Sequence, residues 1–208
     1  MKLKNNNGIK NIIFDLGNVI IDLDQEATKQ EFKYLFGDQY KSIMADLKER
    51  GVLKKYETGQ ISTQTFLNEF ASFDENVSFD EIKNAWNAML LDIPAENYKI
   101  LEAAKANYRT FCLSNTNKLH IDFIYKQLKT KKGLSNLNGF FEKVYLSHEI
   151  GKRKPNEDIF QHVLQSNGLN PEETLFIDDT EKHLVGAKAL GIQVLHMEDD
   201  MRLSDLFE

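Results

Sequence analysis

One carboxylate near the start of the chain, Asp15, stands where it could act as a nucleophile or a metal ligand. The preceding run Ile12–Phe14 is apolar throughout, as expected of a strand buried on both faces of a sheet. Asp15 then falls at the carboxyl end of that strand, where open α/β sheets bind their ligands. A charge there is unfavourable unless a cation or a reaction uses it. A simpler interpretation, in which Asp15 caps the next turn, stays open from this stretch alone.

Small polar residues follow a second apolar run, Thr110–Leu113. Ser114 and Asn115, with the next two residues, supply hydroxyls, an amide and backbone N–H groups at the start of a helix. Such groups can bind a phosphate or another oxyanion. Ordinary helix capping also accounts for serine and asparagine at this place.

A lysine followed by proline, Lys154-Pro155, ends a run of three cations. Runs of cations commonly lie on a solvated surface. Pro155, however, is expected to begin a helix, which would hold the Lys154 ammonium near the strand ends. A lysine fixed there can neutralise a phosphate and a neighbouring carboxylate together.

Two adjacent carboxylates, Asp178 and Asp179, follow the apolar run Leu175–Ile177. They repel each other, and a hard cation such as Mg²⁺ bound between them and Asp15 would relieve the repulsion. Capping of the following helix needs only one of them. Taken together, the four strand ends predict a metal-assisted attack by Asp15 on phosphorus, with the phosphoryl oxygens bound by Ser114 and Lys154.

Apolar runs and helical periods along the chain indicate how these residues are positioned. Five runs have strand character: Ile12–Phe14, Thr110–Leu113, Val144–Leu146, Leu175–Ile177 and Ile192–Leu195. Helical patterns over Pro94–Tyr108, Pro155–Asn167 and Thr180–Leu190 alternate with the later runs. This alternation predicts an α/β fold with a Rossmann-like parallel sheet as its core.

The region from residue 24 to residue 92 has a different pattern. It has no strand-like run, and apolar residues recur there with helical spacing, as at Phe32, Leu35 and Phe36. Ser78 and Glu81 match a capping box that opens its last helix. We therefore expect an all-helical cap domain over residues 24–92, inserted into a core domain made of residues 1–23 and 93–208. An insertion just after the first strand would lie over the strand ends as a lid.

Composition limits the partners of the chain. Its 208 residues carry a net charge of −6, which argues against a nucleic-acid partner. No basic amphipathic segment or long apolar run suggests a membrane, and the first eight residues are too polar for a signal peptide. The single cysteine, Cys112, excludes an internal disulfide and is expected to be a buried apolar residue. These features predict a cytoplasmic protein, and they leave its oligomeric state open.

The four strand ends resemble the four motifs of the haloacid dehalogenase superfamily in order and spacing. The first motif matches the run from Asp15 to Val19, the second Ser114, the third Lys154, and the fourth the pair Asp178-Asp179. The helical insert resembles the cap placed after the first motif in this superfamily. Within it, Phe-Asp-Leu-Gly-Asn-Val, Leu-Ser-Asn-Thr-Asn and Gly-x-Arg-Lys-Pro are similar to the bacterial α-D-glucose-1-phosphate phosphatase group.

The resemblance implies a Mg²⁺-dependent phosphatase of small phosphate monoesters such as sugar phosphates. It implies that Asp15 is the nucleophile and becomes an aspartyl phosphate. Mg²⁺ would be held by Asp15, by the backbone carbonyl of Gly17 and by Asp179, with Asp178 nearby or acting through water. The phosphoryl group would be bound by Ser114, Asn115 and Lys154.

The chain departs from the superfamily pattern at two positions. Most phosphatases of the superfamily carry a second aspartate where this chain has Gly17, and that aspartate protonates the leaving group and later activates water. Gly17 can do neither, although its carbonyl can still reach a metal. His183 stands where close relatives often have asparagine, and a structural role is expected for it rather than that of a general base.

Three other functions fit parts of the pattern. Dehalogenases of the superfamily also lack the second aspartate, but they work without metal and would leave the pair Asp178-Asp179 unexplained. A phosphomutase needs the acid that Gly17 has replaced. A binding or regulatory protein that has lost catalysis would have no need to keep Asp15 and Lys154.

Overall fold

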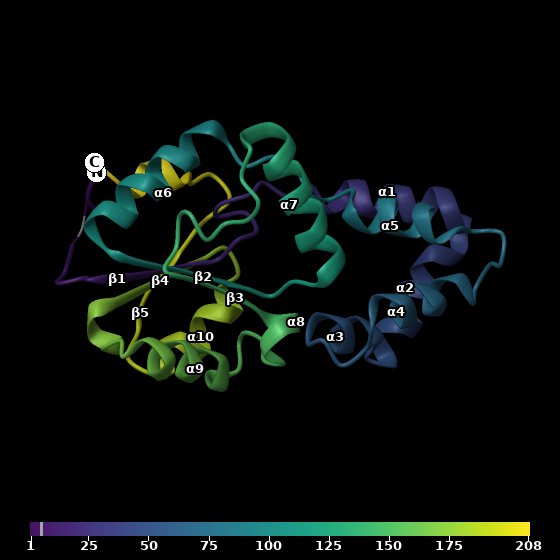
Figure 1. Cartoon of the computed structure of the whole chain (residues 1–208). Coiled ribbons are helices and arrows are strands. Elements are labelled where there is room, and N and C mark those ends of the chain that lie inside the picture. The colour runs from purple at the N-terminus through teal and green to yellow at the C-terminus, as the bar shows by residue number, and fades with distance from the viewer. Residues whose placement is uncertain (5) are drawn as a thin grey trace.

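The computed structural model describes residues 1–4 and 6–208, and a parallel five-stranded sheet forms its centre (Figure 1). The strands are β1 (Asn11–Phe14), β2 (Arg109–Ser114), β3 (Lys143–Leu146), β4 (Thr174–Asp178) and β5 (Gln193–His196). Their order across the sheet is β3-β2-β1-β4-β5, and every neighbouring pair is parallel. The predicted Rossmann-like parallel sheet is confirmed, with strand boundaries within a residue or two of those expected.

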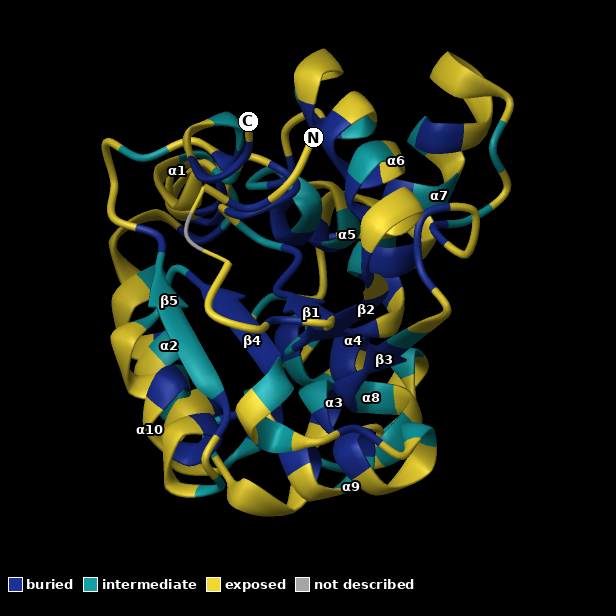
Figure 2. Ribbon diagram, turned by 90° about the vertical axis from the view of Figure 1, so that its left-hand side faces the viewer, coloured by how far each residue is buried: buried dark blue, intermediate teal, exposed yellow. Residues whose placement is uncertain are grey.

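Helices cover both faces of the sheet (Figure 1). They are α6 (Ala95–Asn107) and α7 (Lys118–Lys132) on one face, and α9 (Glu157–Asn167) and α10 (Glu181–Ala189) on the other, with the short α8 (Ser147–Ile150) after β3. Side chains of β1 alternate between the two layers, because Ile12 and Phe14 pack into one hydrophobic cluster and Ile13 into another. Figure 2 shows β1 and β4 as buried, whereas β5 at the edge is only partly buried.

The helical insert follows β1 and extends away from the sheet (Figure 1). It contains α1 (Gln25–Phe36), α2 (Tyr40–Glu49), α3 (Val52–Glu57), α4 (Thr63–Ala71) and α5 (Phe79–Asn87). These helices enclose a second hydrophobic core built on aromatic rings, among them Phe32, Phe66, Phe70 and Trp86. The predicted capping box at the start of α5 is present. The two separate cores support the proposed cap domain over residues 24–92, whose boundaries stay a prediction.

Several helical features differ from the sequence prediction, and α7 and α8 had no predicted range. The helix expected from Pro155 begins at Glu157, because Pro155 and Asn156 lie in a turn closed by the Asn156 N–H donating to the carbonyl of Arg153. Helix α3, which lies between the apolar stripes, was not predicted. It has six residues, too few to show a helical repeat in the sequence.

The cap packs against the start of α7. Leu119 of α7 belongs to the hydrophobic core of the cap, and its N–H donates to the hydroxyl of Tyr56 from α3. The Trp86 ring stacks on His120 with centroids 5.3 Å apart, and its indole N–H donates to the amide oxygen of Asn117. These contacts hold the cap over the carboxyl ends of the strands.

Helix length and surface charge add two further observations. Among the helices of residues 1–4 and 6–208, none is both long and apolar enough to cross a membrane.

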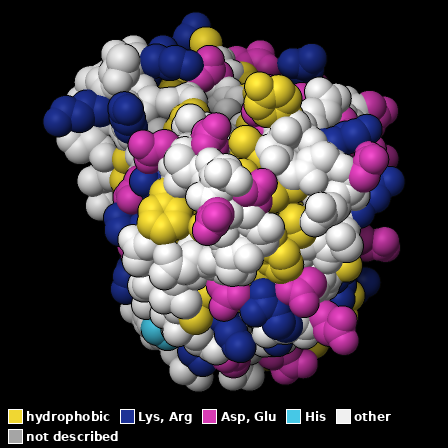
Figure 3. Space-filling model, turned by 90° about the vertical axis from the view of Figure 1, so that its right-hand side faces the viewer, with side chains coloured by type: hydrophobic (Ala, Val, Ile, Leu, Met, Phe, Trp, Pro, Cys, Tyr) yellow, Lys and Arg dark blue, Asp and Glu magenta, His cyan; other side chains and the backbone are white. Residues whose placement is uncertain are grey.

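Figure 3 views the molecule from the cap end and shows lysine and arginine side chains interspersed with acidic and hydrophobic ones.

Candidate active site

The predicted catalytic residues converge where the strand order of the sheet reverses. From β1 the chain moves outward to β2 and β3, then returns to the other side of β1 as β4 and β5. Asp15 follows the last residue of β1, and its N–H donates to the carbonyl of Ile177 in β4. Ser114 ends β2 and Asp178 ends β4, so the structure brings these three residues to one edge of the sheet. Ligands of open α/β sheets bind at this kind of crevice.

Lys154 lies at the centre of this edge and is completely buried. Its ammonium group is 2.7 Å from Oδ1 of Asp15 and 2.6 Å from Oδ2 of Asp178. It donates a third hydrogen bond to the carbonyl of Leu113, at 3.0 Å. One cation thus joins two carboxylates from neighbouring strands, and all three of its protons have acceptors.

Burial and charge shift the three ionisable groups in different directions. Burial raises the pKa of Asp15 to about 6, opposed by Lys154 and assisted by the charge of Asp178. Burial alone would also raise the pKa of Asp178, but its hydrogen bond with His183 and the charge of Lys154 outweigh it and lower that pKa. Burial would lower the pKa of Lys154, yet the two carboxylates raise it, so the lysine is a cation at neutral pH.

His183 has a structural role in this network. Its Nδ1 lies 3.0 Å from Oδ1 of Asp178, and its Nε2 lies 3.4 Å from the amide nitrogen of Asn115. These contacts fit a ring whose Nδ1 donates to Asp178 and whose Nε2 accepts from Asn115. With both ring nitrogens engaged, His183 orients its neighbours, as expected from the sequence.

The side chain of Asn115 holds the backbone of Lys154 in place. Its amide nitrogen donates to the carbonyl of Lys154, and its amide oxygen accepts from the N–H of Lys154, both at 2.9 Å. This pair of hydrogen bonds, rather than the start of a helix, positions the lysine backbone. Since the side chain of Asn115 is committed in this way, its backbone and the hydroxyl of Ser114 are the groups left to face a phosphoryl oxygen.

Asp179 lies beside the loop that follows β1. One of its carboxylate oxygens accepts from the amide of Asn18 at 2.9 Å, and the other from the hydroxyl of Thr180 at 3.1 Å. Asn18 has a positive φ of 51° and also accepts from the N–H of Leu23, where the chain enters the cap. Asn18 therefore joins the second aspartate of the pair to the base of the cap.

The donor set of this edge fits a divalent metal ion. Ligand atoms of Asp15, Asp178 and His183 all lie within 4.8 Å of one another. Two carboxylates here share a single lysine, so the cluster retains negative charge that a cation would neutralise. Carboxylate and carbonyl oxygens are the ligands Mg²⁺ prefers, and Asp15, Asp179 and the carbonyl of Gly17 offer them at the same loop ends.

A cavity of about 250 Å³ lies between this edge and the cap. Gly17, Ser114 and Asn115 line it from the core, whereas Glu57, Trp86, Met89 and others line it from the cap side. Trp86, expected to belong only to the core of the cap, packs in that core and also borders the cavity. Phe66 lies wholly within the core of the cap, as expected.

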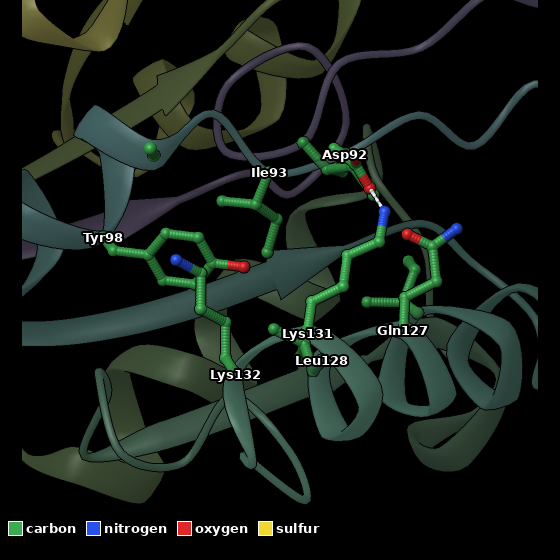
Figure 4. Close-up of a pocket in the computed structure, with 10 residues that line it drawn as sticks. Asp92, Ile93, Tyr98, Gln127, Leu128, Lys131 and Lys132 are labelled. Carbon is green, nitrogen blue, oxygen red and sulfur yellow. Dashed lines mark hydrogen bonds and ion pairs between the residues drawn. The ribbon is translucent and has the colours of Figure 1, made fainter.

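A different cavity, of about 270 Å³, lies between α6 and α7 (Figure 4). Asp92 and Lys131 form an ion pair at its rim, and the ammonium of Lys132 lies over the ring of Tyr98. Its lining includes none of the predicted site residues. The candidate active site is therefore the cavity beneath the cap.

Glu57 is the site residue that sequence reasoning missed. It ends α3, and its carboxylate pairs with Arg153, the residue before Lys154, at 3.0 Å. The available signal was a charged residue immediately before a Thr-Gly turn within the cap. That signal indicates a turn, but not that the turn faces the strand ends.

Comparison with known proteins places this geometry in a family. A model of the haloacid dehalogenase-like hydrolase family matches residues 12–197. The chain belongs to this family of hydrolases. The resemblance inferred from Asp15, Ser114, Lys154 and the aspartate pair is thereby confirmed.

Individual members of the haloacid dehalogenase-like family resemble the chain over nearly its whole length. D-ribitol-5-phosphate phosphatase of Bacteroides thetaiotaomicron is 27% identical over 192 residues, which cover 92% of this chain and 93% of the relative. A crystal structure of a family enzyme from the same organism, in complex with magnesium and inorganic phosphate, has a TM-score of 0.87 and 33% identity, covering 96% of this chain and 100% of that one. A family hydrolase from Porphyromonas gingivalis has a TM-score of 0.82 and 32% identity, covering 93% of each chain.

Proposed function

We propose that this protein is a Mg²⁺-dependent phosphatase of small phosphate monoesters, with Asp15 as the nucleophile. The observation that carries the proposal is the buried Lys154 ammonium, bonded to both Asp15 and Asp178. A fully buried lysine between two carboxylates costs desolvation free energy that a purely structural apolar residue would avoid. Its placement beside Ser114 suits a phosphoryl group that must approach an anionic nucleophile.

The residues have distinct roles in this reaction. The carboxylate of Asp15 attacks phosphorus, and the ester oxygen leaves with its electron pair, giving an aspartyl phosphate that water then hydrolyses. Lys154 orients Asp15 and offsets negative charge, while Ser114 and the backbone of Asn115 bind phosphoryl oxygens. Mg²⁺, held by Asp15, Asp179 and the carbonyl of Gly17 with Asp178 nearby, would supply further neutralisation of the phosphoryl charge.

Sugar and sugar-alcohol phosphates are the proposed substrate class. The cavity of about 250 Å³ is small, and the polar residues Ser114, Asn115 and Glu57 are among those that line it. Such a lining suits a polyhydroxylated ester. Glucose 1-phosphate is the candidate that follows from the sequence resemblance, and the relative named as a D-ribitol-5-phosphate phosphatase adds pentitol phosphates to the candidates.

A phosphate-release screen over these esters, with excess Mg²⁺ and with excess chelator, tests the proposal. We expect release that requires Mg²⁺, and we expect Asp179→Ala to raise the Mg²⁺ concentration needed for half-maximal rate. Asp38→Ala, at an exposed cap residue, is the matched control and should leave that concentration unchanged. Full activity in chelator, or halide release from haloacids without phosphate release, would contradict the proposal.

A further inference from the structure

Hydrolysis at this site needs a proton that its nucleophile loop does not offer. Gly17 has no side chain, so the departing oxygen of an alkyl phosphate gains no proton from that position. A positioned general acid contributes about 10²–10⁴-fold to such a step. Another ionisable group that borders the same cavity is therefore expected.

Glu57 is the only carboxyl-bearing residue among the described residues that line the cavity. His120 also borders it, but burial lowers the pKa of this histidine to about 4, and both of its nitrogens have hydrogen-bond partners in Asn117 and Trp86. His120 is therefore neutral near pH 7, and its N–H is bound to the carbonyl of Trp86, so it is a poor general acid. Glu57 is left as the group able to exchange a proton.

The turn that carries Glu57 is fastened to the core, although it belongs to the cap. The backbone carbonyl of Glu57 lies 2.6 Å from the hydroxyl of Ser147 in α8. Two residues on, Gly59 has a φ of +66°, and a Cβ added there would lie 2.1 Å from the carbonyl oxygen of His148. Only glycine permits so close an approach, so the turn sits directly on α8.

The side chain of Glu57 reaches the loop that carries Lys154. Its Oε2 lies 3.0 Å from the guanidinium of Arg153. Arg153 precedes Lys154, whose backbone is bound by Asn115. The carboxyl group is thus bound to the residue that precedes, in the sequence, the lysine bonded to Asp15.

The surroundings of Glu57 favour its protonated form more than water does. Burial raises its pKa above the usual range, although the charges of Arg153 and His183 act in the opposite direction. A carboxyl group shifted in this way is better matched to proton transfer near neutral pH.

We propose that Glu57 of the cap is the acid and base of this hydrolysis, in the role that Gly17 leaves vacant. The inference rests on the proposed phosphatase function. As Asp15 bonds to phosphorus and the P–O ester bond breaks, the departing oxygen takes the electron pair of that bond and the proton of Glu57. Water then attacks phosphorus, Glu57 accepts a proton from it, and the P–O bond to Asp15 breaks, restoring both carboxyl groups and releasing phosphate.

Glu57→Gln tests this role through the leaving group. We expect kcat/KM for glucose 6-phosphate, a primary alkyl ester, to fall about 10²–10⁴-fold. For p-nitrophenyl phosphate, whose leaving group needs no proton, the fall should be less than tenfold. Glucose 1-phosphate should lie between them, because an anomeric oxygen leaves more readily. The ratio of the glucose 1-phosphate rate to the glucose 6-phosphate rate should therefore be larger in the variant than in the wild type.

Glu69→Gln is the matched control. Glu69 is also a cap glutamate paired with an arginine, Arg50, and its side chain is 28% exposed, as is that of Glu57. It lies outside the cavity lining, so the control should keep wild-type kcat/KM on all three esters. Glu57→Asp retains a carboxyl group and should therefore stay nearer the wild-type ratio of alkyl to aryl rates. If Glu57→Gln does not fold, this variant tests the role of Glu57 in its place.

Several outcomes would overturn the role of Glu57. An equal loss on the alkyl and aryl esters, or no loss on either, would show that Glu57 does not protonate the leaving group. Wild-type hydrolysis of p-nitrophenyl phosphate but of no alkyl ester would also contradict it. If the wild type releases phosphate from none of the esters, the proposed phosphatase function fails instead.

Discussion

Two adjacent cations of the candidate site, Lys154 and Arg153, make ion pairs that differ in burial and in what they connect. Lys154 joins Asp15 and Asp178 within the core, where these three side chains are at most 9% exposed. Arg153 joins the core to Glu57 of the cap, and both partners are more than a quarter exposed. Adjacent residues of one loop therefore make a buried bridge and a partly solvated one.

The difference separates two tasks of the site. A buried charge that loses its partner is strongly unfavourable, so the geometry around Lys154 is held in one arrangement. A partly exposed pair contributes little to stability and can rearrange around a ligand at small cost. In the proposed reaction, attack on phosphorus would thus depend on the rigid core, whereas protonation of the leaving group would depend on a contact that the cap can adjust.

Lys154→Met should have the largest effect on stability. It leaves Asp15 and Asp178 facing each other in the interior without a cation, and breaking a buried pair costs about 3–5 kcal/mol. Urea unfolding followed by circular dichroism should show that loss in the free energy of unfolding. A loss below 1 kcal/mol would mean that the buried bridge does not hold this edge together.

Asp15→Asn should reveal a pH-dependent cost of the buried carboxylate in metal-free protein. The pKa of Asp15 is raised to about 6 in the folded chain, so its contribution to stability is complete below the unfolded value of 3.8 and is lost as pH rises through 6. The variant has no carboxyl group at this position, so its stability does not fall with pH for this reason. Its free energy of unfolding relative to wild type should therefore rise by roughly 2–3 kcal/mol between pH 4 and pH 7.5. A difference independent of pH would refute the raised pKa.

Arg153→Met should have the smallest effect on stability. Its pair with Glu57 is partly exposed, and such pairs contribute about 0–1 kcal/mol. Thermal unfolding of this variant should resemble that of Arg50→Met, which breaks the exposed pairs with Asp46 and Glu69 on the cap. A much larger loss for Arg153→Met would show that the solvated bridge, like the buried one, is structural.

The sequence predicted the core edge well because three of the proposed site residues end or directly follow an apolar strand. In a parallel sheet the strand ends meet at one edge, so Asp15, Ser114 and Asp178 are brought together by topology alone. Asn115 was harder to interpret, since its hydrogen bonds to the backbone of Lys154 exist only after β2 and the loop before α9 have packed. Residue type indicated a polar group there, but not its partner.

The cap was less predictable than the core. Helix α3 has six residues, fewer than two turns, so its apolar positions show no period. The position of Glu57 over the cavity follows from the close packing of Gly59 on α8, a contact between segments about ninety residues apart in the sequence. Trp86 packs in the core of the cap and also borders the cavity. The helical spacing of apolar residues in the sequence predicts only its place in the core.

Asp15 is the proposed nucleophile on which the whole reaction depends. The most direct test is kcat/KM for p-nitrophenyl phosphate in excess Mg²⁺, measured on wild type and on folded Asp15→Asn. Since an amide of nearly the same size is a far weaker nucleophile, we expect a loss of at least about 10³-fold. Activity of Asp15→Asn within tenfold of wild type would contradict the account.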